Sequence, residues 1–402
     1  MTPSIPDHRA ANVTLTIADA AGKPLANAPI TVRQTAHKFL FGCNAYAVDT
    51  ADASPLQQAY QARFCGLLNF ATLPFYWGAF ESQPGQPQTQ RLKGMAAWCR
   101  QNHIRTKGHP LCWHEVWPAW MAGKGDPEVL DLQMARITRD VAEFEGDIDT
   151  WDVLNEACVM PDFTRAPSAL IAISRKIGAV ELIRQAFAAA RAANPAATLL
   201  LNDYDVSPKY EEIIDRCLQA GIDIDVIGIQ SHMHMGYWGK EKAHDVCERF
   251  ARFGKPLHFT ELTLTSGEIK KEVRWGGPPH TDWPSTPEFE DRQCRDAVEF
   301  YSTLFAHPAV QAITWWDFCD NKCWLGAPGG LLRKDGSPKP AYDALHDLIR
   351  RQWWTGELKL TTNPAGVAHF RGTLGDYALQ VRGREHTFKL SSPGLAPMAV
   401  AV

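Results

Sequence analysis

Apolar runs alternate with longer amphipathic stretches through the middle of this chain. Residues 179–193 are typical of the stretches, because Leu182, Ile183, Ala186 and Ala190 follow the i, i+3/i+4 spacing of a buried helix face. Strand–helix alternation of this kind indicates a parallel sheet, and eight repeats favour a closed (β/α)₈ TIM barrel over an open doubly wound sheet. The strand-like runs lie at 39–45, 67–73, 104–109, 150–155, 198–202, 224–231, 257–261 and 312–318.

The two chain ends have the period-two pattern of β-strands instead. Apolar residues alternate around Leu15 and Ile17 near the N-terminus and around Leu379 and Val381 near the C-terminus, with Gly and Pro at the turns between. Two separate hairpins would each be marginally stable. We therefore expect an α/β protein in which an N-terminal β segment (1–36) and a C-terminal β segment (353–402) form a small accessory β-sandwich beside the barrel (37–352).

The net charge and the distribution of apolar residues argue against nucleic acid and membranes as partners. A net charge of −4 gives no electrostatic reason to expect nucleic acid or an anionic membrane. No stretch approaches the ~20 apolar residues that span a bilayer. The first residues lack a basic segment followed by an apolar one, so no signal peptide is predicted; the protein is cytoplasmic, or exported if a leader has been removed. Oligomeric state is left open.

Cofactor and metal sites are not predicted. The ten cysteines are scattered, and the one close pair, Cys319 and Cys323, has no second pair to complete a zinc site. Reduced, buried thiols fit this arrangement better than a disulfide framework. Neither a GxGxxG motif nor a P-loop follows the first strand, which argues against a bound nucleotide.

Polar and aromatic residues collect where the predicted strands end, the edge at which TIM barrels gather their functional groups. A glutamate at a strand end is commonly a rim charge, and a tryptophan is commonly core, but six of eight ends carry such residues. Carboxylates, amides and indoles together suit a neutral polyhydroxylated substrate, which indicates a carbohydrate. The ends read Gly108-His109, Asn155-Glu156, Asn202-Asp203-Tyr204, Gln230-Ser231-His232, Thr260-Glu261 and Trp315-Trp316-Asp317.

Five spaced motifs lie in residues 35–350: Lys107-Gly-His-Pro-Leu-Cys-Trp-His114, Trp151-Asp-Val-Leu-Asn-Glu-Ala157, Ile227-Gly-Ile-Gln-Ser-His232, Phe259-Thr-Glu261, and Trp324-Leu-Gly followed by Pro338-Lys-Pro-Ala-Tyr342. Together they resemble glycoside hydrolase family 10, known for endo-β-1,4-xylanases that act with retention. The resemblance implies that Glu156 is the acid/base and Glu261 the nucleophile. Retention then requires a raised pKa for Glu156 and a low one for Glu261.

The resemblance also implies a set of substrate-binding residues. Asn155 would hydrogen-bond the 2-hydroxyl of the sugar in subsite −1. For Tyr204, a substrate contact and a structural role are equally supported. The remaining residues would bracket the nucleophile (Gln230, His232), line subsite −1 (His109, Trp113) or cap it (Trp316, Trp324).

The sequence departs from the family after the second strand. Family xylanases carry Glu-Asn-x-x-Lys there to grip the sugar in subsite −2, whereas this chain reads Leu73-Pro-Phe-Tyr-Trp-Gly78. Pro, Phe and Gly supply no acid, amide or ammonium group. We therefore predict that Phe75, Tyr76 and Trp77 make subsite −2 an apolar aromatic surface and that activity on plain xylan is weak.

Two further departures concern the seventh strand. The family's Glu-Leu-Asp, whose Asp supports the histidine on the sixth strand, becomes Glu261-Leu-Thr263, so His232 should lose part of its charge support. The segment Arg274–Trp283 reads as an extended loop whose two tryptophans would form either an aglycone site or a structural lid.

The predicted function is therefore a retaining glycoside hydrolase acting on xylan or xylo-oligosaccharides. Another β-glycoside, with decorated sugars or an apolar aglycone, is the alternative substrate, and endo or exo action is open. A non-catalytic carbohydrate-binding protein would not need both glutamates. A metal-dependent amidohydrolase, suggested by His232-Met-His234, would carry that motif on its first strand rather than its sixth.

Overall fold

A computed structural model describes residues 5–165, 168–273, 280, 282–321 and 323–402. The chain forms two compact units, one of residues 41–342 and the other of residues 1–40 with 343–402. We propose that these units are the two domains of the protein. Within the described ranges, no helix combines the length and the apolar character needed to cross a bilayer.

The larger unit is built on a closed barrel of parallel strands in the order β10-β3-β4-β5-β6-β7-β8-β9. Each strand overlaps one of the apolar runs, so the predicted TIM barrel is confirmed. The strands are β3 (Leu40–Asn44), β4 (Phe70–Pro74), β5 (Arg105–His109), β6 (Thr150–Asn155), β7 (Thr198–Asp203), β8 (Val226–Ile229), β9 (Leu257–Leu262) and β10 (Val310–Trp315).

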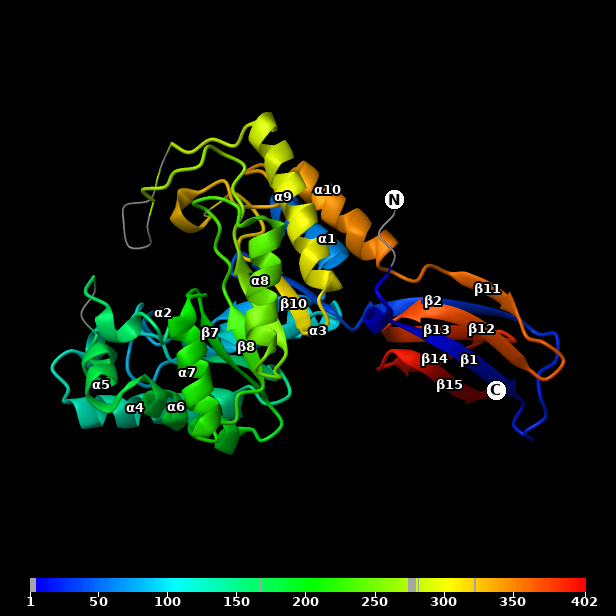
Figure 1. Cartoon of the computed structure of the whole chain (residues 1–402), viewed down its shortest axis with the longest axis horizontal. Helices are drawn as coiled ribbons and strands as arrows, with labels where there is room; N and C mark the ends of the chain where they lie inside the picture. The colour runs from blue at the N-terminus through cyan, green and yellow to red at the C-terminus, as the bar shows by residue number, and fades with distance from the viewer. Residues whose placement is uncertain (1–4, 166–167, 274–279, 281, 322) are drawn as a thin grey trace. The chain divides into compact units, whose positions relative to one another are not determined.

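Helices follow the strands because each amphipathic stretch buries one apolar face. In α7, Ser207 caps the first turn by accepting from the Lys209 amide, and Ile214 and Cys217 are buried. Helices α4, α6 and α7 pack in sequence around the barrel (Figure 1). The helices are α1 (Pro55–Leu67), α2 (Trp77–Phe80), α3 (Thr89–Gln101), α4 (Asp126–Glu143), α5 (Ala169–Ile177), α6 (Ala179–Ala193), α7 (Pro208–Gln219), α8 (Gly239–Ala251), α9 (Pro287–Ala306) and α10 (Pro340–Asp347).

The smaller unit is the predicted β-sandwich. Its sheets, β12-β1-β15 and β11-β2-β13-β14, share one apolar core that includes Leu15 of β1, Val32 of β2 and Leu379 of β13. N-terminal strands pair with C-terminal ones in both sheets, and β15, a strand beyond the predicted pattern, runs parallel to β1. The strands are β1 (Ala10–Ala18), β2 (Pro29–His37), β11 (Leu358–Thr361), β12 (Val367–Thr373), β13 (Gly375–Val381), β14 (Arg384–Leu390) and β15 (Gly394–Ala401).

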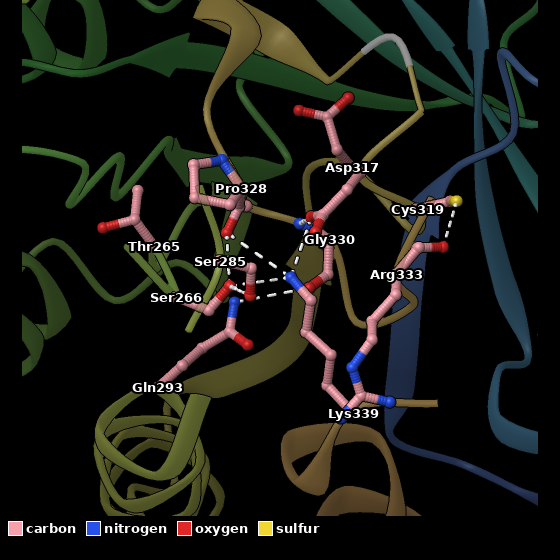
Figure 2. Close-up of polar contacts among 12 residues, drawn as sticks. Thr265, Ser266, Ser285, Gln293, Asp317, Cys319, Pro328, Gly330, Arg333 and Lys339 are labelled. Carbon is pink, nitrogen blue, oxygen red and sulfur yellow. Dashed lines mark hydrogen bonds and ion pairs between the residues drawn. The ribbon is translucent and has the colours of Figure 1, made fainter. Parts of the chain in front are cut away.

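A buried lysine anchors the long loop between β10 and α10. The Lys339 ammonium lies 2.8 Å from Asp320 Oδ1 and 2.8 Å from Ser266 Oγ, and its side chain is fully buried. Ser266 Oγ also donates to the Pro328 carbonyl at 3.0 Å, a cluster that Figure 2 shows. Removing one partner of a buried ion pair is costly, so this contact fixes the loop that carries Trp324 against the segment after β9.

Candidate active site

The carboxyl ends of the barrel strands surround a cavity of about 380 Å³. The ten residues predicted as catalytic or substrate-binding from the family resemblance all line this one cavity, although they come from six different strands or the loops that follow them. They are His109, Trp113, Asn155, Glu156, Tyr204, Gln230, His232, Glu261, Trp316 and Trp324.

Glu156, directly after β6, is surrounded by neutral hydrogen-bond donors. Trp113 Nε1 donates to its Oε2 at 3.0 Å and Gln230 Nε2 to its Oε1 at 3.0 Å. Burial raises the pKa of Glu156 to about 8 despite these two bonds. Its backbone has a φ of 60°, a left-handed conformation that costs a non-glycine residue about 1–3 kcal/mol. The partly buried carboxyl is therefore held in place and is protonated at neutral pH.

Glu261 on β9 is surrounded by imidazoles instead. His232 Nε2 lies 3.1 Å from its Oε2, and His109 Nε2 lies 3.9 Å from its Oε1, which also accepts from Asn202 Nδ2 at 2.8 Å. Burial acts to raise the pKa of Glu261, but the charge of His109 and the hydrogen bond and charge of His232 outweigh it and leave the pKa below its usual value. Glu261 is therefore an ionised carboxylate.

A buried pair of opposite charges, Lys107 and Asp152, supports His109. His109 Nδ1 is 2.7 Å from Asp152 Oδ2, and Lys107 Nζ is 2.6 Å from the same oxygen, with Lys107 and Asp152 fully buried. Because Asp152 accepts at Nδ1, the other ring nitrogen of His109 faces Glu261. Lys107 and Asp152 lie in two of the family motifs, but the motifs alone assign them no role. Opposite charges at the centres of two neighbouring predicted strands were the signal that could have identified them.

An amide cluster connects the two glutamates. Asn155 Oδ1 accepts from Asn202 Nδ2 at 2.8 Å and from Gln230 Nε2 at 3.2 Å, and these two amides also bind Glu261 and Glu156, respectively. Asn202, to which the sequence pattern assigns no role, accepts a hydrogen bond from Thr260 Oγ1 at 2.7 Å through its Oδ1. Residue 228 has to be glycine, because a Cβ there would lie 2.4 Å from Asn202 Oδ1.

Indole rings form the walls of the cavity. The Trp324 ring stacks on His232 with centroids 4.3 Å apart, and Trp316 meets the rings of His109 and His232 edge-on at 5.4 and 5.8 Å. Asp317 Oδ2 accepts from the Trp324 amide at 3.0 Å, which links the two tryptophan-bearing segments. Faces of this kind bind the apolar faces of sugar rings.

The predicted aromatic surface for subsite −2 is wrong at two of its three residues. Phe75 is fully buried and packs on the Trp151 ring at 4.9 Å, and Trp77 is 5% exposed and donates to Glu81 Oε2 at 3.0 Å. Only Tyr76 lines the cavity. Consecutive side chains after β4 point in different directions, and the two more apolar rings gain more from joining the core than from facing water.

Most of the loop predicted at Arg274–Trp283 lies outside the described residues. Trp283 is described: it is 6% exposed and donates to the Glu268 carbonyl at 2.8 Å. Its ring packs with Val273 and Ala327, so Trp283 belongs to a small core cluster rather than to an aglycone surface.

Neither histidine of His232-Met-His234 belongs to the one group with metal-ligand spacing among the described residues. That group is His114, Glu115 and Glu156, whose ligand atoms lie within 4.8 Å of one another. His232 instead contacts Glu261 and, through Nδ1, Thr263 Oγ1 at 2.9 Å, and His234 meets the Trp324 ring edge-on at 4.9 Å.

Comparison with known proteins agrees with this geometry. The model of "Glycosyl hydrolase family 10" matches residues 33–348. An endo-1,4-beta-xylanase/feruloyl esterase of Xylanibacter ruminicola is 30% identical over 257 residues, which cover 58% of this chain and 35% of that protein. Endo-1,4-beta-xylanase B of Thermotoga neapolitana is 28% identical over 267 residues, covering 62% of this chain and 71% of that protein.

Solved structures show the same fold. Xylanase 10B of Thermotoga petrophila, crystallised with xylobiose, superposes with a TM-score of 0.66 at 22% identity, covering 78% of this chain and 95% of that one. A barrel with paired carboxyls, amides and indoles at its strand ends defines a glycosidase. This chain belongs to glycosyl hydrolase family 10, so the resemblance predicted from its motifs is confirmed.

Proposed function

We propose that this protein hydrolyses β-1,4-linked xylose chains with retention of configuration, using Glu261 as nucleophile and Glu156 as acid/base. The opposite protonation of two carboxyls in one cavity supports this assignment most directly. Burial raises the pKa of Glu156 to about 8, whereas His109 and His232 overcome the effect of burial and hold that of Glu261 below its usual value. Retention needs this pairing of a protonated acid and an ionised nucleophile, with carboxyls about 5–5.5 Å apart.

In the first step, Glu261 attacks the anomeric carbon of the sugar in subsite −1 while the bond from that carbon to the leaving oxygen breaks. Glu156 transfers its proton to that oxygen, and a covalent glycosyl ester of Glu261 forms. Asn155 is placed to hydrogen-bond the 2-hydroxyl, because its amide lies between the two carboxyls. Trp316 and Trp324 would enclose the ring.

In the second step, Glu156 removes a proton from water, and the water oxygen attacks the anomeric carbon and releases Glu261. The charge of Glu261 is one of the causes that raise the pKa of Glu156. The ester carries no charge, so the pKa of Glu156 falls once it forms. The same carboxyl is therefore an acid in the first step and a base in the second.

Proton NMR of the first product tests the proposal. With xylo-oligosaccharide substrates, the β-anomer should appear before mutarotation produces the α-anomer. Early appearance of the α-anomer would contradict retention. Sugar binding without any turnover of xylo-oligosaccharides or aryl β-xylosides would favour the binding-protein alternative.

A second substrate class, β-glycosides with an apolar aglycone, is favoured by the outer wall of the cavity. Tyr204 is 46% and Met235 41% exposed, so both present apolar surface to a ligand in the cavity. Comparing kcat/KM for xylohexaose with that for β-xylosides of apolar aryl alcohols separates the two classes. The apolar lining consists of Val159, Phe163, Tyr204, Val206, Met235, Trp238 and Val273.

A further inference from the structure

The side of the cavity that lies across the barrel from Tyr204 ends in a cluster of three aromatic rings. Tyr46 follows β3 and Tyr76 follows β4, and their hydroxyls are 3.4 Å apart. The Tyr46 ring meets those of Tyr76 and Trp316 edge-on, with centroids 5.9 and 5.6 Å apart. We name Tyr46, Tyr76 and Trp316 the tyrosine wall.

The wall stands on the glycone side of the scissile bond. Glu156 protonates the leaving oxygen from the end of β6, and Tyr204 follows the neighbouring strand β7. In the closed strand order, β7 lies four positions from β3, on the opposite side of the barrel. A substrate whose leaving group passes over β6 and β7 therefore points its non-reducing end at Tyr46 and Tyr76.

The catalytic cavity stops at this wall. Beyond it lies a second cavity of about 760 Å³, which Tyr46 lines together with Asp49, Gln90 and Arg91. Among the described residues, no lining residue is shared between the two cavities. Tyr46 lines the second cavity and contacts Tyr76 and Trp316, which line the catalytic cavity. Its ring therefore separates the two cavities.

The backbone holds Tyr76 in this position. The Phe75 amide donates to the His109 carbonyl at 2.7 Å, and the Gly78 amide donates to the Val116 carbonyl at 2.7 Å. A Cβ at Gly78 would lie 2.6 Å from that Val116 oxygen, so the two segments touch. The buried guanidinium of Arg136 also donates to the Phe75 carbonyl. Tyr76 is therefore part of a fixed structure rather than a side chain on a free loop.

We propose that the tyrosine wall closes the site after a single glycone sugar, so that the enzyme releases one sugar at a time from the non-reducing end of its substrate. This inference rests on the proposed function. An internal cut would need a further glycone sugar at the position that Tyr46 and Tyr76 fill. The relatives above are named endo-xylanases, so release of single sugars would distinguish this chain from them.

Xylohexaose labelled at its reducing end tests the proposal with the intact protein. The first labelled product should be the pentaose, with xylose as the unlabelled product. Labelled dimer, trimer or tetramer appearing first would overturn the closed wall. A 4-nitrophenyl β-xyloside assay runs in parallel: turnover of that substrate together with internal cuts refutes only the wall, whereas no turnover of either substrate refutes the proposed function.

Variants locate the cause. Tyr46→Ala and the double variant Tyr46→Ala/Tyr76→Ala should join the two cavities and shift the first labelled product from pentaose toward tetraose and triose. Tyr46→Phe keeps the ring and should keep the pentaose as the first labelled product. Circular dichroism confirms that each variant is folded. If folded alanine variants still release only xylose, the wall does not set the mode of cleavage.

Discussion

Glu156 and Glu261 are the same amino acid in one cavity, yet their surroundings impose opposite states. Glu156 accepts bonds from an indole and an amide, neither of which carries charge. Glu261 lies against His232 and near His109, whose orientation Asp152 fixes. Burial raises both pKa values in principle, and only Glu261 has cationic neighbours to reverse the effect. The neighbours, rather than the carboxyl itself, thus favour the two proposed roles, acid/base for Glu156 and nucleophile for Glu261.

The largest loss of activity is expected from substitution of Glu261. Glu261→Ala removes the atom that bonds to the anomeric carbon, so turnover of every substrate, including aryl β-xylosides, should fall to background. Steady-state rates measure it, and Glu261→Gln serves as the isosteric control. Residual turnover near the wild-type rate in either folded variant would contradict the assignment of Glu261.

Glu156→Ala should have a large effect that depends on the leaving group. General acid catalysis contributes roughly 10²–10⁴-fold, so cleavage of xylohexaose should fall by that factor. The first step with a 2,4-dinitrophenyl β-xyloside needs no protonation and should proceed as a burst followed by slow deglycosylation. An equal loss with both substrates would show that Glu156 is not the acid.

The pH dependence of kcat/KM should be bell-shaped, because it follows the free enzyme. Activity requires ionised Glu261, whose pKa is lowered, so the acidic limb should lie below its ordinary value of 4.5. Activity also requires protonated Glu156, so the alkaline limb should lie at about 8. In Glu156→Gln, the alkaline limb should disappear from the remaining activity on activated aryl glycosides. An unchanged limb would assign it to another group.

Asp152→Asn should weaken the surroundings of Glu261 without touching substrate. It removes a charge-assisted bond to His109, worth about 1.5–3 kcal/mol, so kcat should fall by roughly 10–100-fold. With less positive charge on His109, the acidic limb should also move to higher pH. A fall in kcat without that movement would indicate a purely structural role for the buried Lys107–Asp152 pair.

The smallest expected effect is that of Thr263→Asp, which restores the family's carboxylate beside His232. Thr263 Oγ1 already lies 2.9 Å from His232 Nδ1, so the ring orientation should not change. The added charge should favour the imidazolium and move the acidic limb of kcat/KM to lower pH, with kcat changing by less than ~10-fold. Thr263→Val, which removes the bond altogether, is the matched control and should move the limb the other way.

The order of the strands and helices, and many of the residues that line the cavity, could be predicted from the sequence. Strand runs such as Thr150–Asn155 coincide with the structure because parallel barrel strands are buried on both faces and therefore read as apolar runs. The carboxyl ends of such strands meet at one edge, which is why residues as distant in the chain as His109 and Trp324 line one cavity. Strand β15 was missed because Pro397 and small residues weaken its pattern.

What the sequence alone determined is the chemistry: the barrel, the family and the two glutamates follow from local pattern and motif. Tertiary structure decided which neighbour each group has. Phe75, Tyr76 and Trp77 are all aromatic, yet only Tyr76 lines the cavity. Its hydroxyl contacts that of Tyr46, which follows a different strand. Side-chain direction and long-range contact depend on how strands pack across the barrel. No local pattern encodes that packing, and the pKa values of Glu156 and Glu261 depend on it.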